Sequence, residues 1–394
     1  HKEDLSDGTI IVFDPKDHPW TQIDFIKRVI LLSLPMRDLI TANRADPVMR
    51  NTIALGATMA ILGTPLEFLS RVIVDQFKRK GDEVIAQNIT IAKCGYDAVK
   101  QTGIDLQHCT LSPGRQIGRK LIVNGSEAVG LGAVRAGLKF AAIYPMTPIN
   151  SLITFLADHA KKLNLVYRQP EDEIAGINMA IGASIAGVRS MVATSGGGFA
   201  LMVEGVSLAG MVEVPLVIDM GMRVGPATGM PTYTEQGELL FVIHAGHGEF
   251  PKIVLAPGDA KEAYEMTIDA FNLADRYQLP VFILTDKYLN ENQWCVSETV
   301  MNQPVSIDRG KLVTHDKLPA DGSFKRYDVS VTDGISPRSV PGIQHGHYWA
   351  NSYEHDQTGH MAESSGARIA MAQKRLQKYD AITKDMKLPS VYGD

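Results

Sequence analysis

Glu173 is the carboxylate that the sequence places in the setting most suited to chemistry. It follows Pro170, Glu171 and Asp172 at the start of a helical pattern. The residues that follow it at helical spacing on the same face are apolar or small: Ile177, Ala180, Ile181 and Ser184. A carboxylate on a face turned towards a core is desolvated, so we expect its pKa to rise and the group to share a proton with a ligand. For Glu171 and Asp172, favourable interaction with the helix dipole is a sufficient role.

Thr147 and Arg223 are candidates for holding a substrate. Thr147 lies between Pro145 and Pro148 in a stiff turn after the apolar run 139–144, and open α/β sheets bind ligands at such strand ends. Arg223 is a single cation in the glycine-, proline- and threonine-rich stretch 221–232, where a guanidinium can bind a carboxylate bidentately. The competing interpretation of Arg223 is an exposed loop arginine.

Glycines supply a further signal. The stretch Thr194-Ser195-Gly196-Gly197-Gly198 ends another apolar run, where glycines let the backbone approach a ligand closely. Gly130 and Gly132, followed by Gly137, resemble a dinucleotide-binding loop, but the third glycine falls two residues late. Nicotinamide binding therefore stays an alternative.

Two other patterns have a structural and a functional interpretation. Gly182-Ala183-Ser184 and Gly205-Val206-Ser207 resemble a nucleophile elbow without its final glycine, but both serines lie within helical patterns, which favours helix packing. A histidine cluster occurs in a polar loop with no cysteine nearby: His345, His347, His355 and His360. Hydrogen bonding within the loop is favoured over metal binding there, so we expect no metal ligands in this chain.

The elements that must position these residues alternate regularly after residue 120. The apolar runs typical of strands are Leu121–Val123, Phe140–Tyr144, Leu165–Tyr167, Met191–Thr194, Pro215–Met220, Ile253–Ala256 and Val281–Thr285. The helical patterns between most of them are Glu127–Leu138, Ile149–Lys161, Glu173–Ala186, Phe199–Val212, Thr234–His244 and Asp259–Tyr277. Continuous apolar strands alternating with helices predict an α/β fold with a doubly wound parallel sheet covered on both faces.

Four parts are expected along the chain. Residues 1–112 combine one strand, Thr9–Asp14, with several helical patterns. Because a lone strand is not a complete sheet, this part resembles the C-terminal part of an α/β domain. A linker is expected at 113–119 and the regular α/β domain at 120–300. Residues 301–394 contain a long turn-rich segment, Ser306–His360, which we expect to be functional or to wrap a partner, and a basic helix, Ser364–Asp380.

Composition limits the classes of function. The 394 residues are 45% hydrophobic and 21% charged, as in ordinary globular proteins. The net charge of −5 gives no support to nucleic-acid or anionic-membrane partners. No apolar run reaches membrane length, and no signal peptide is visible.

The cysteines and the chain ends carry two more expectations. Cys94, Cys109 and Cys295 lie too far apart to form a CxxC site or to hold a four-cysteine iron–sulfur cluster, and they favour a reducing, cytoplasmic setting. The chain opens at His1 without methionine and stops after a Pro-Ser-Val-Tyr-Gly turn. We therefore expect both ends to be cuts within a longer polypeptide.

Between about Asn124 and Gly342 the chain resembles the α subunit of the 2-oxoacid:ferredoxin oxidoreductases, and the 2-oxoglutarate type in particular. The matching stretches are NGSEAVGLGAVRAG, YPMTP, QPEDEIAG, TSGGGFALMVEGVSLAGMVEVPLVI, RVGPATGMPTYTEQGE and YDVSVTDGISPRSVPG, continued by EHDQTGHMAESSGAR. Residues 1–112 resemble the latter part of the γ domain that many relatives carry ahead of the α part. At Met146 relatives commonly have isoleucine, but the threonine and both prolines of this turn are kept.

The resemblance implies that residues 120–300 form a pyrimidine-binding domain for thiamine diphosphate. Glu173 then corresponds to the glutamate that hydrogen-bonds the cofactor's aminopyrimidine ring and favours its imino tautomer. Thr147 and Arg223 match positions that hold the substrate, Arg223 by its carboxylate, and Thr232 would line the pocket for the substrate side chain. The further cofactor-binding positions are Tyr144, Pro145, Ser195, Gly196 and Gly197.

The resemblance also implies a reaction and its partners. The family decarboxylates a 2-oxoacid, here most closely 2-oxoglutarate to succinyl-CoA, with coenzyme A as co-substrate and ferredoxin as electron acceptor, or runs the reverse carboxylation. The chain has no Gly-Asp-Gly followed by an Asn pair, the usual magnesium–diphosphate motif, and no cluster cysteines. Mg²⁺ and a [4Fe–4S] cluster are therefore expected in a β subunit, the active site at an α–β interface, and the assembly as α2β2. The alternatives are a nicotinamide-dependent dehydrogenase and a non-catalytic scaffold.

Overall fold

The computed structural model describes residues 2–106, 109–111, 118–313, 318, 321, 323–389, 391 and 393. The chain divides into two compact units, His1–Gln116 and Ile117–Asp394. Residues 113–117 of the expected linker lie outside the described residues. No helix that the described residues form is long and apolar enough to cross a membrane.

The first unit packs helices around a short pair of strands. The strands β1 (Ile10–Phe13) and β2 (Ile30–Ser33) pair in parallel. The helices are α1 (Met36–Ala42), α2 (Arg50–Ile61), α3 (Leu66–Phe77) and α4 (Asp82–Gln101), with short 3-10 helices at Lys2–Asp4, Gln22–Asp24 and Pro47–Met49. The expectation of a lone strand is wrong, because the basic residues Lys27 and Arg28 conceal the short apolar run of β2.

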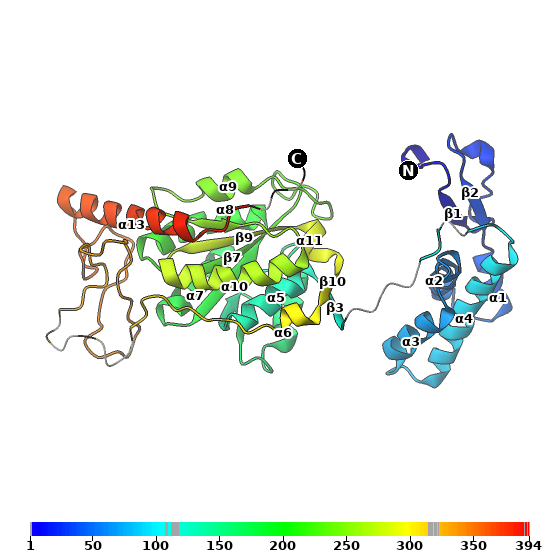
Figure 1. Ribbon diagram of the computed structural model, residues 1–394, viewed down its shortest axis with the longest axis horizontal. Coiled ribbons are helices and arrows are strands. Elements are labelled where there is room, and N and C mark those ends of the chain that lie inside the picture. The colour runs from blue at the N-terminus through cyan, green and yellow to red at the C-terminus, as the bar shows by residue number, and fades with distance from the viewer. Residues whose placement is uncertain are drawn as a thin grey trace. The chain divides into compact units, whose positions relative to one another are not determined.

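The second unit is built on a six-stranded parallel sheet in the order β5-β4-β6-β7-β9-β8. Its strands are β4 (Leu138–Ala142), β5 (Val166–Arg168), β6 (Arg189–Thr194), β7 (Leu216–Met222), β8 (Ile253–Leu255) and β9 (Pro280–Asp286). Its helices are α5 (Gly125–Arg135), α6 (Asn150–His159), α7 (Glu173–Ile185), α8 (Gly196–Met211), α9 (Leu239–His244), α10 (Ala260–Tyr277), α11 (Lys287–Glu291), α12 (Glu298–Met301) and α13 (Ser365–Asp385). The predicted doubly wound parallel sheet is confirmed (Figure 1).

Alternate residues of the strands contribute to two apolar cores. Val217 and Val281 pack with α5, α6 and α10 on one face, whereas Ile218 and Phe282 pack with α7 and α8 on the other. A sheet that is covered on both faces needs apolar residues at every strand position, which is why its strands were readable as continuous apolar runs.

The first predicted strand lies outside this sheet. β3 (Lys120–Asn124) pairs antiparallel with β10 (Gln293–Ser297). Val123 is buried, but Ile122 is 73% exposed, so this pair keeps one face in water. The expectation that Leu121–Val123 joins the parallel sheet is therefore wrong.

Helix α9 begins later than expected, at Leu239 rather than Thr234. Thr234 Oγ1 accepts a hydrogen bond from the Tyr288 amide, and Gln236 Nε2 donates one to Asp286 Oδ2 at 2.6 Å. These contacts with the end of β9 and the start of α11 hold residues 234–236 in a loop.

The amino ends of the strands carry two buried ion clusters. Glu213, just before β7, binds Lys374 and Lys378 of α13 at 2.7 Å, and all three side chains are 1% exposed. Burial alone would raise the pKa of Glu213, but the two ammonium groups hold it far below its usual range. Asp275 of α10 likewise binds three arginines at 2.8–2.9 Å: Arg189, Arg309 and Arg338.

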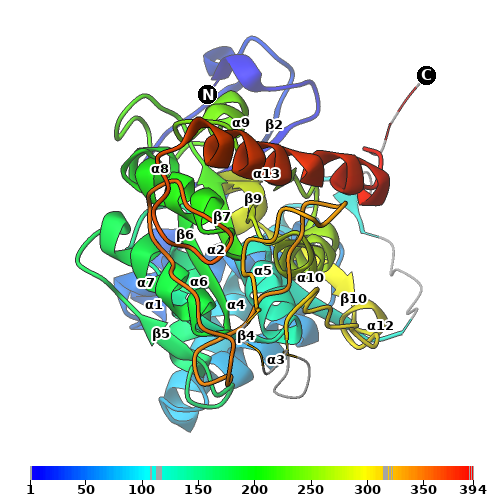
Figure 2. The same cartoon turned by 90° about the vertical axis from the view of Figure 1, so that its left-hand side faces the viewer.

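The segment between α12 and α13 packs on its own domain. Its described residues form no helix or strand, yet Arg326 and Tyr327 are fully buried. Arg326 Nη2 donates a 2.7 Å hydrogen bond to Glu213 O. Figures 1 and 2 show this segment (orange) and α13 (red) together at one end of the second unit. The expectation that the segment also wraps a partner stays a prediction.

Candidate active site

Glu173 is the first residue of α7, at the carboxyl end of the sheet. Its side chain is 3% exposed, on the same helix face as Ile177 and Ile181. The helix is capped by its neighbour: Asp172 Oδ1 accepts from the Ala175 amide at 2.8 Å. Burial raises the pKa of Glu173, as expected from its position, and its Oε1 has no hydrogen-bond partner among the described residues. Its catalytic role stays a prediction.

The carboxyl group of Glu173 lies against the first turn of α8. A Cβ added to Gly198 would lie 2.3 Å from Glu173 Oε1 and 2.1 Å from Thr194 Oγ1. Both distances are far below van der Waals contact, so only glycine fits at this position. The glycine-rich stretch is thus the surface on which the carboxylate rests.

Ser195 stands at the N-cap of α8 without acting as a cap. It is fully buried, and its Oγ has no partner among the described residues. The Ser195 side chain therefore does not cap the amide groups at the start of α8, which carry the positive end of the helix dipole. The space beside Gly197 is open, because an added Cβ would meet only Ala227 O, at 3.7 Å, an ordinary van der Waals distance.

Arg223 and Thr147 are brought together. Arg223 follows β7 directly and is 8% exposed, and its Nη1 donates a 2.8 Å hydrogen bond to Thr147 O. The interpretation of Arg223 as an exposed loop arginine is therefore wrong. The contact uses the backbone of Thr147, so the substrate roles of the hydroxyl and of the remaining guanidinium protons stay predictions.

The other predicted positions in these two segments differ in exposure. Tyr144 is half-buried and Pro145 is exposed. Thr232 is exposed. It follows a turn that an antiparallel bridge between Val224 and Met230 closes. Gly229 lies in this turn at φ +55°. Only glycine fits there, because an added Cβ would lie 1.8 Å from Val224 O.

Glu238 is a site residue that the sequence analysis missed. An added Cβ on Gly196 would lie 2.6 Å from its Oε1, and its Oε2 is buried with no partner among the described residues. Burial and then the neighbouring charge of Glu235 raise the pKa of Glu238, while Arg223 opposes the rise. An acid directly before the apolar run 239–243 was the available signal, but the helix expected from Thr234 placed this residue inside an ordinary helical pattern.

Asp219, in the centre of β7, was also missed. It is fully buried, and burial raises its pKa to about 7 despite a hydrogen bond from Thr285 Oγ1 at 3.1 Å. Thr285 Oγ1 in turn accepts from Asn290 Nδ2 at 2.9 Å. Asp219 Oδ2 and Asn290 Oδ1 have no partners among the described residues. A lone polar residue within an apolar strand pattern was the signal for this cluster.

The weaker motifs have structural roles. Gly130 and Gly132 lie inside α5, where added Cβ atoms would meet Phe155 at 2.4 Å and Tyr264 O at 2.5 Å, so they form no phosphate loop. Ser184 donates to Pro215 O at 2.6 Å and Ser207 to Val203 O at 3.2 Å, which agrees with helix packing rather than a nucleophile elbow.

Two of the four loop histidines, His355 and His360, make hydrogen bonds within their loop. His355 Nδ1 contacts Tyr353 O at 3.0 Å, and His360 Nδ1 contacts Thr358 Oγ1 at 2.8 Å. In the part of the chain that the structure describes, no group of three or more His, Cys, Asp or Glu is placed to hold a metal ion.

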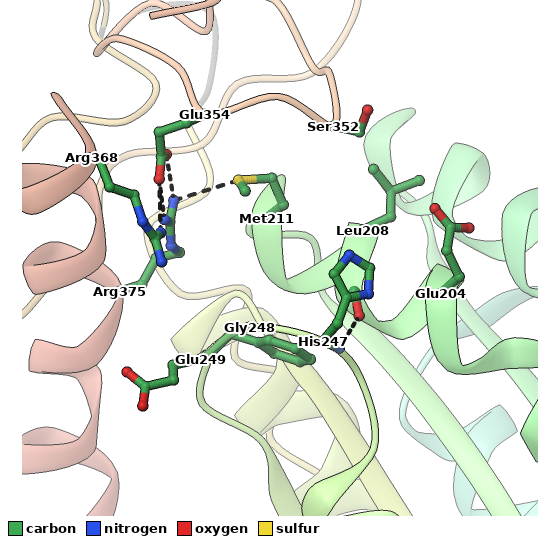
Figure 3. Close-up of a pocket in the computed structure, with 12 residues that line it drawn as sticks. Glu204, Leu208, Met211, His247, Gly248, Glu249, Ser352, Glu354, Arg368 and Arg375 are labelled. Carbon is green, nitrogen blue, oxygen red and sulfur yellow. Dashed lines mark hydrogen bonds and ion pairs between the residues drawn. The ribbon is translucent and has the colours of Figure 1, made fainter. Parts of the chain in front are cut away.

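A cavity of about 290 Å³ lies at the other end of α8 (Figure 3). Glu204, Ser207 and Met211 of α8 line it, so it lies roughly 10–20 Å along the helix from Gly197. On its far side Glu354 binds both Arg368 and Arg375, at 2.9 and 2.8 Å. None of the predicted site residues lines this cavity, which is therefore separate from the candidate active site.

Family models match most of the chain. The model described as "Pyruvate flavodoxin/ferredoxin oxidoreductase, thiamine diP-bdg" matches residues 131–374, which include Thr147, Glu173, Arg223 and Glu238. A second model, "Pyruvate ferredoxin/flavodoxin oxidoreductase", matches residues 1–98.

Several curated proteins are similar to the chain. It is 38% identical over 362 residues to 2-oxoacid:ferredoxin oxidoreductase 1, subunit alpha, of Sulfurisphaera tokodaii, covering 88% of this chain and 55% of that protein. It is 38% identical over 374 residues to the corresponding subunit alpha of Saccharolobus solfataricus, covering 90% and 56%. It is 44% identical over 188 residues to the 2-oxoglutarate synthase subunit KorA of Archaeoglobus fulgidus, covering 48% and 54%. The chain thus spans about half the length of the curated relatives it matches.

A solved structure has the same fold. The 2-oxoglutarate:ferredoxin oxidoreductase from Magnetococcus marinus, with 2-oxoglutarate, coenzyme A and succinyl-CoA bound, superimposes with a TM-score of 0.91 at 33% identity. The match covers 100% of this chain and 68% of that one.

Proposed function

The chain belongs to the pyruvate ferredoxin/flavodoxin oxidoreductase family, and from that premise we propose that it is the pyrimidine-binding part of the α subunit of a 2-oxoacid:ferredoxin oxidoreductase. The proposed reaction is the coenzyme A-dependent oxidative decarboxylation of a 2-oxoacid, 2-oxoglutarate before others, with ferredoxin as acceptor, or the reverse carboxylation. The observation that carries this proposal is the buried carboxyl oxygen Oε1 of Glu173, which lies at the glycine turn of α8 and has no hydrogen-bond partner among the described residues.

The residues at the carboxyl end of the sheet fit the aminopyrimidine half of thiamine diphosphate. Glu173 Oε1 and Ser195 Oγ are buried polar atoms that need a partner, and Gly196 and Gly197 let the backbone approach one. When bound, this cofactor supplies the electron sink for decarboxylation. Because burial raises its pKa, Glu173 can hold a proton at Oε1 and share it with a ring nitrogen.

Arg223 would bind the carboxylate of the 2-oxoacid. A guanidinium has five N–H donors, and the bond to Thr147 O uses one of them. That bond fixes the orientation of Arg223, so the remaining donors can meet a carboxylate without further ordering of the side chain. Thr147 would place its hydroxyl at the same anion, and Thr232 would line the space for the substrate side chain.

The proposal includes a partner that completes the site. Relatives are named as subunit alpha or KorA, which supports a hetero-oligomer. We assign Mg²⁺, the diphosphate half of the cofactor and the [4Fe–4S] cluster to a β subunit in an α2β2 assembly. Free thiols at Cys94, Cys109 and Cys295 support a cytoplasmic setting.

Reconstitution with the β subunit tests the proposal. The chain alone should be folded and inactive, and should bind thiamine diphosphate weakly. With the β subunit, coenzyme A and a panel of 2-oxoacids, reduction of a viologen dye should appear, and omission of coenzyme A serves as the control. Turnover by this chain alone, or no dye reduction with any 2-oxoacid, would overthrow the assignment.

A further inference from the structure

Glu238 occupies the N-cap position of α9 but does not cap that helix. Its side chain lies on α8 instead: from an added Cβ on Gly196, its Oε1, Cγ and Cδ are 2.6, 3.2 and 3.3 Å away. Oε2 is buried and has no partner among the described residues. The carboxyl group is therefore held at the site and has an unused hydrogen-bonding atom.

The charges around Glu238 are unbalanced. Arg223 attracts its carboxylate, whereas Glu235, which accepts from the Gly225 amide at 3.2 Å, repels it. Glu173 of α7 contacts the same turn of α8 two residues further on, at Gly198. At the start of α11, Asp286 accepts from Gln236. Among the described residues, the one cation that acts on the pKa of Glu238 is Arg223, which matches a single substrate carboxylate.

We propose that Glu238 is a specificity-determining residue, whose protonated carboxyl donates a hydrogen bond to the distal carboxylate of a dicarboxylic 2-oxoacid. The inference rests on the proposed function, in which Arg223 takes the other carboxylate. In its acid form Glu238 adds the donor that a dianion needs without adding a second cation. In its ionised form it repels the same group, so that dicarboxylates are rejected while monocarboxylates are not.

The geometry makes the proton available at the right pH. Burial raises the pKa of Glu238 and Glu235 raises it further, so the acid form persists above the ordinary range of a glutamate. The distal carboxylate of 2-oxoglutarate, with a pKa of about 4, stays ionised there. The proposal therefore predicts that the selectivity for dicarboxylic over monocarboxylic 2-oxoacids falls with rising pH.

The first test compares two substrates of equal chain length in the assembled complex. We expect the ratio of kcat/KM for 2-oxoglutarate to that for 2-oxopentanoate to fall with rising pH, by up to about tenfold per pH unit above the pKa of Glu238. Titrations that both substrates share, such as that of Glu173, cancel in this ratio. A ratio that does not change with pH in the wild type overturns the proposal.

Two variants identify the titrating group. Glu238→Gln keeps a donor at every pH, so its ratio should stay constant across the range. Glu238→Leu removes the donor and should lower the ratio at pH 6 by about ten- to a hundredfold. The matched control is Glu235→Gln, which removes a repelling charge, lowers the pKa of Glu238 and should move the fall to lower pH without abolishing it. A fall that persists in Glu238→Gln contradicts the assignment.

A binding measurement separates this inference from the proposed function. Calorimetric titration of the complex with glutarate, at a pH within the range where the kinetic ratio falls and in two buffers of different ionisation enthalpy, should show proton uptake in the wild type and none in Glu238→Gln. Wild-type binding without proton uptake overturns the role of Glu238, whatever the kinetics. Proton uptake in a complex that reduces no dye with any 2-oxoacid supports Glu238 as a dicarboxylate ligand and refutes the proposed reaction instead.

Discussion

Buried carboxylates near the amino ends of the strands have charged partners, whereas those near the carboxyl ends have buried oxygens with no partner among the described residues. At the amino ends of the strands, both oxygens of Glu213 and both of Asp275 bind lysine or arginine at 2.7–2.9 Å. In the centre of β7 and at the carboxyl ends, Asp219, Glu238 and Glu173 each keep one buried oxygen without a partner among the described residues. Burial dominates at this second end and raises the pKa of all three.

This difference in pairing distinguishes carboxylates that stabilise the fold from carboxylates that are available to bind a ligand. A buried carboxylate that lacks a partner costs free energy of folding, and a chain selected only for stability would pair or remove it. The amino ends of the strands show that this chain can build such pairs from α10, α13 and the intervening segment. Carboxyl oxygens that lack a partner among the described residues are thus consistent with the proposed function, in which a ligand supplies the missing contact.

Stability should respond most strongly to Glu213→Gln. Removing the charge leaves Lys374 and Lys378 buried without a counter-ion, and we expect a loss of about 3–5 kcal/mol in the free energy of unfolding. The same substitution at Glu173 removes an unpaired carboxylate and should cause no such loss. Chemical denaturation of both variants, followed by far-ultraviolet circular dichroism, gives the comparison. Equal losses at the two positions would contradict the contrast between the two ends.

The second prediction concerns activity. Glu173→Gln preserves the size of the side chain beside Ile177 and Ile181 but removes the acid group, so kcat should fall at least about a hundredfold. Hydrogen–deuterium exchange at the thiazolium carbon of bound thiamine diphosphate should slow with it.

Glu171→Gln and Asp172→Asn are the matched controls for Glu173. Glu171 is exposed and Asp172 acts as the cap of α7, so both should keep normal exchange. Normal exchange in Glu173→Gln, or its collapse in Glu171→Gln, would show that another carboxylate does this work. An active Glu173→Gln complex would favour the scaffold alternative for this chain.

Arg223→Ala is expected to have a smaller effect. A charge-assisted bond to the substrate carboxylate contributes roughly 1.5–3 kcal/mol, or about ten- to a hundredfold in kcat/KM. Thiamine diphosphate should still bind, which a fluorescence titration of the complex can check. Unchanged kinetics with every 2-oxoacid would show that Arg223 serves only its bond to Thr147 O.

The smallest expected effect is the pH dependence caused by Asp219. Its folded pKa of about 7 lies above its ordinary value of 3.8, so the folded state binds the proton more tightly than the unfolded state. This contribution to stability is full below pH 3.8 and is lost as pH rises towards 7. Relative to Asp219→Asn, which mimics the protonated group, the wild type should lose about 1 kcal/mol between pH 6 and pH 7. Parallel stability curves for the two proteins would contradict this pKa.

Much of the fold could be predicted because the parallel sheet leaves a strong pattern. Strands covered on both faces must be apolar throughout, so β4, β6, β7 and β9 were visible as continuous runs. β10 was missed because its residues, Gln293–Ser297, mix polar and apolar types. β3 was placed in the wrong sheet because Ile122 continues an apolar run although it is exposed. An apolar run predicts that a strand is buried but does not predict which strand it pairs with.

The site was predictable where a residue's own helix fixes its surroundings. Glu173 shares a face with Ile177 and Ile181, and local periodicity was enough to expect its burial. Glu238 depends on a contact with Gly196, 42 positions away. Asp219 depends on a hydrogen bond from Thr285 of β9, which in turn accepts one from Asn290 of α11. Contacts of this kind depend on the order of strands in the sheet, which composition and periodicity do not encode.

The length of α8 has a mechanical consequence. Its 16 residues span about 24 Å, from the glycine turn beneath Glu173 to Met211, whose sulfur lies 3.6 Å from Arg375 Nη1 of α13. A continuous helix is stiff along its axis, so a displacement at one tip reaches the other almost undiminished. We therefore expect the position of the glycine turn to depend partly on the contact between Met211 and Arg375 of α13, at the other end of the helix.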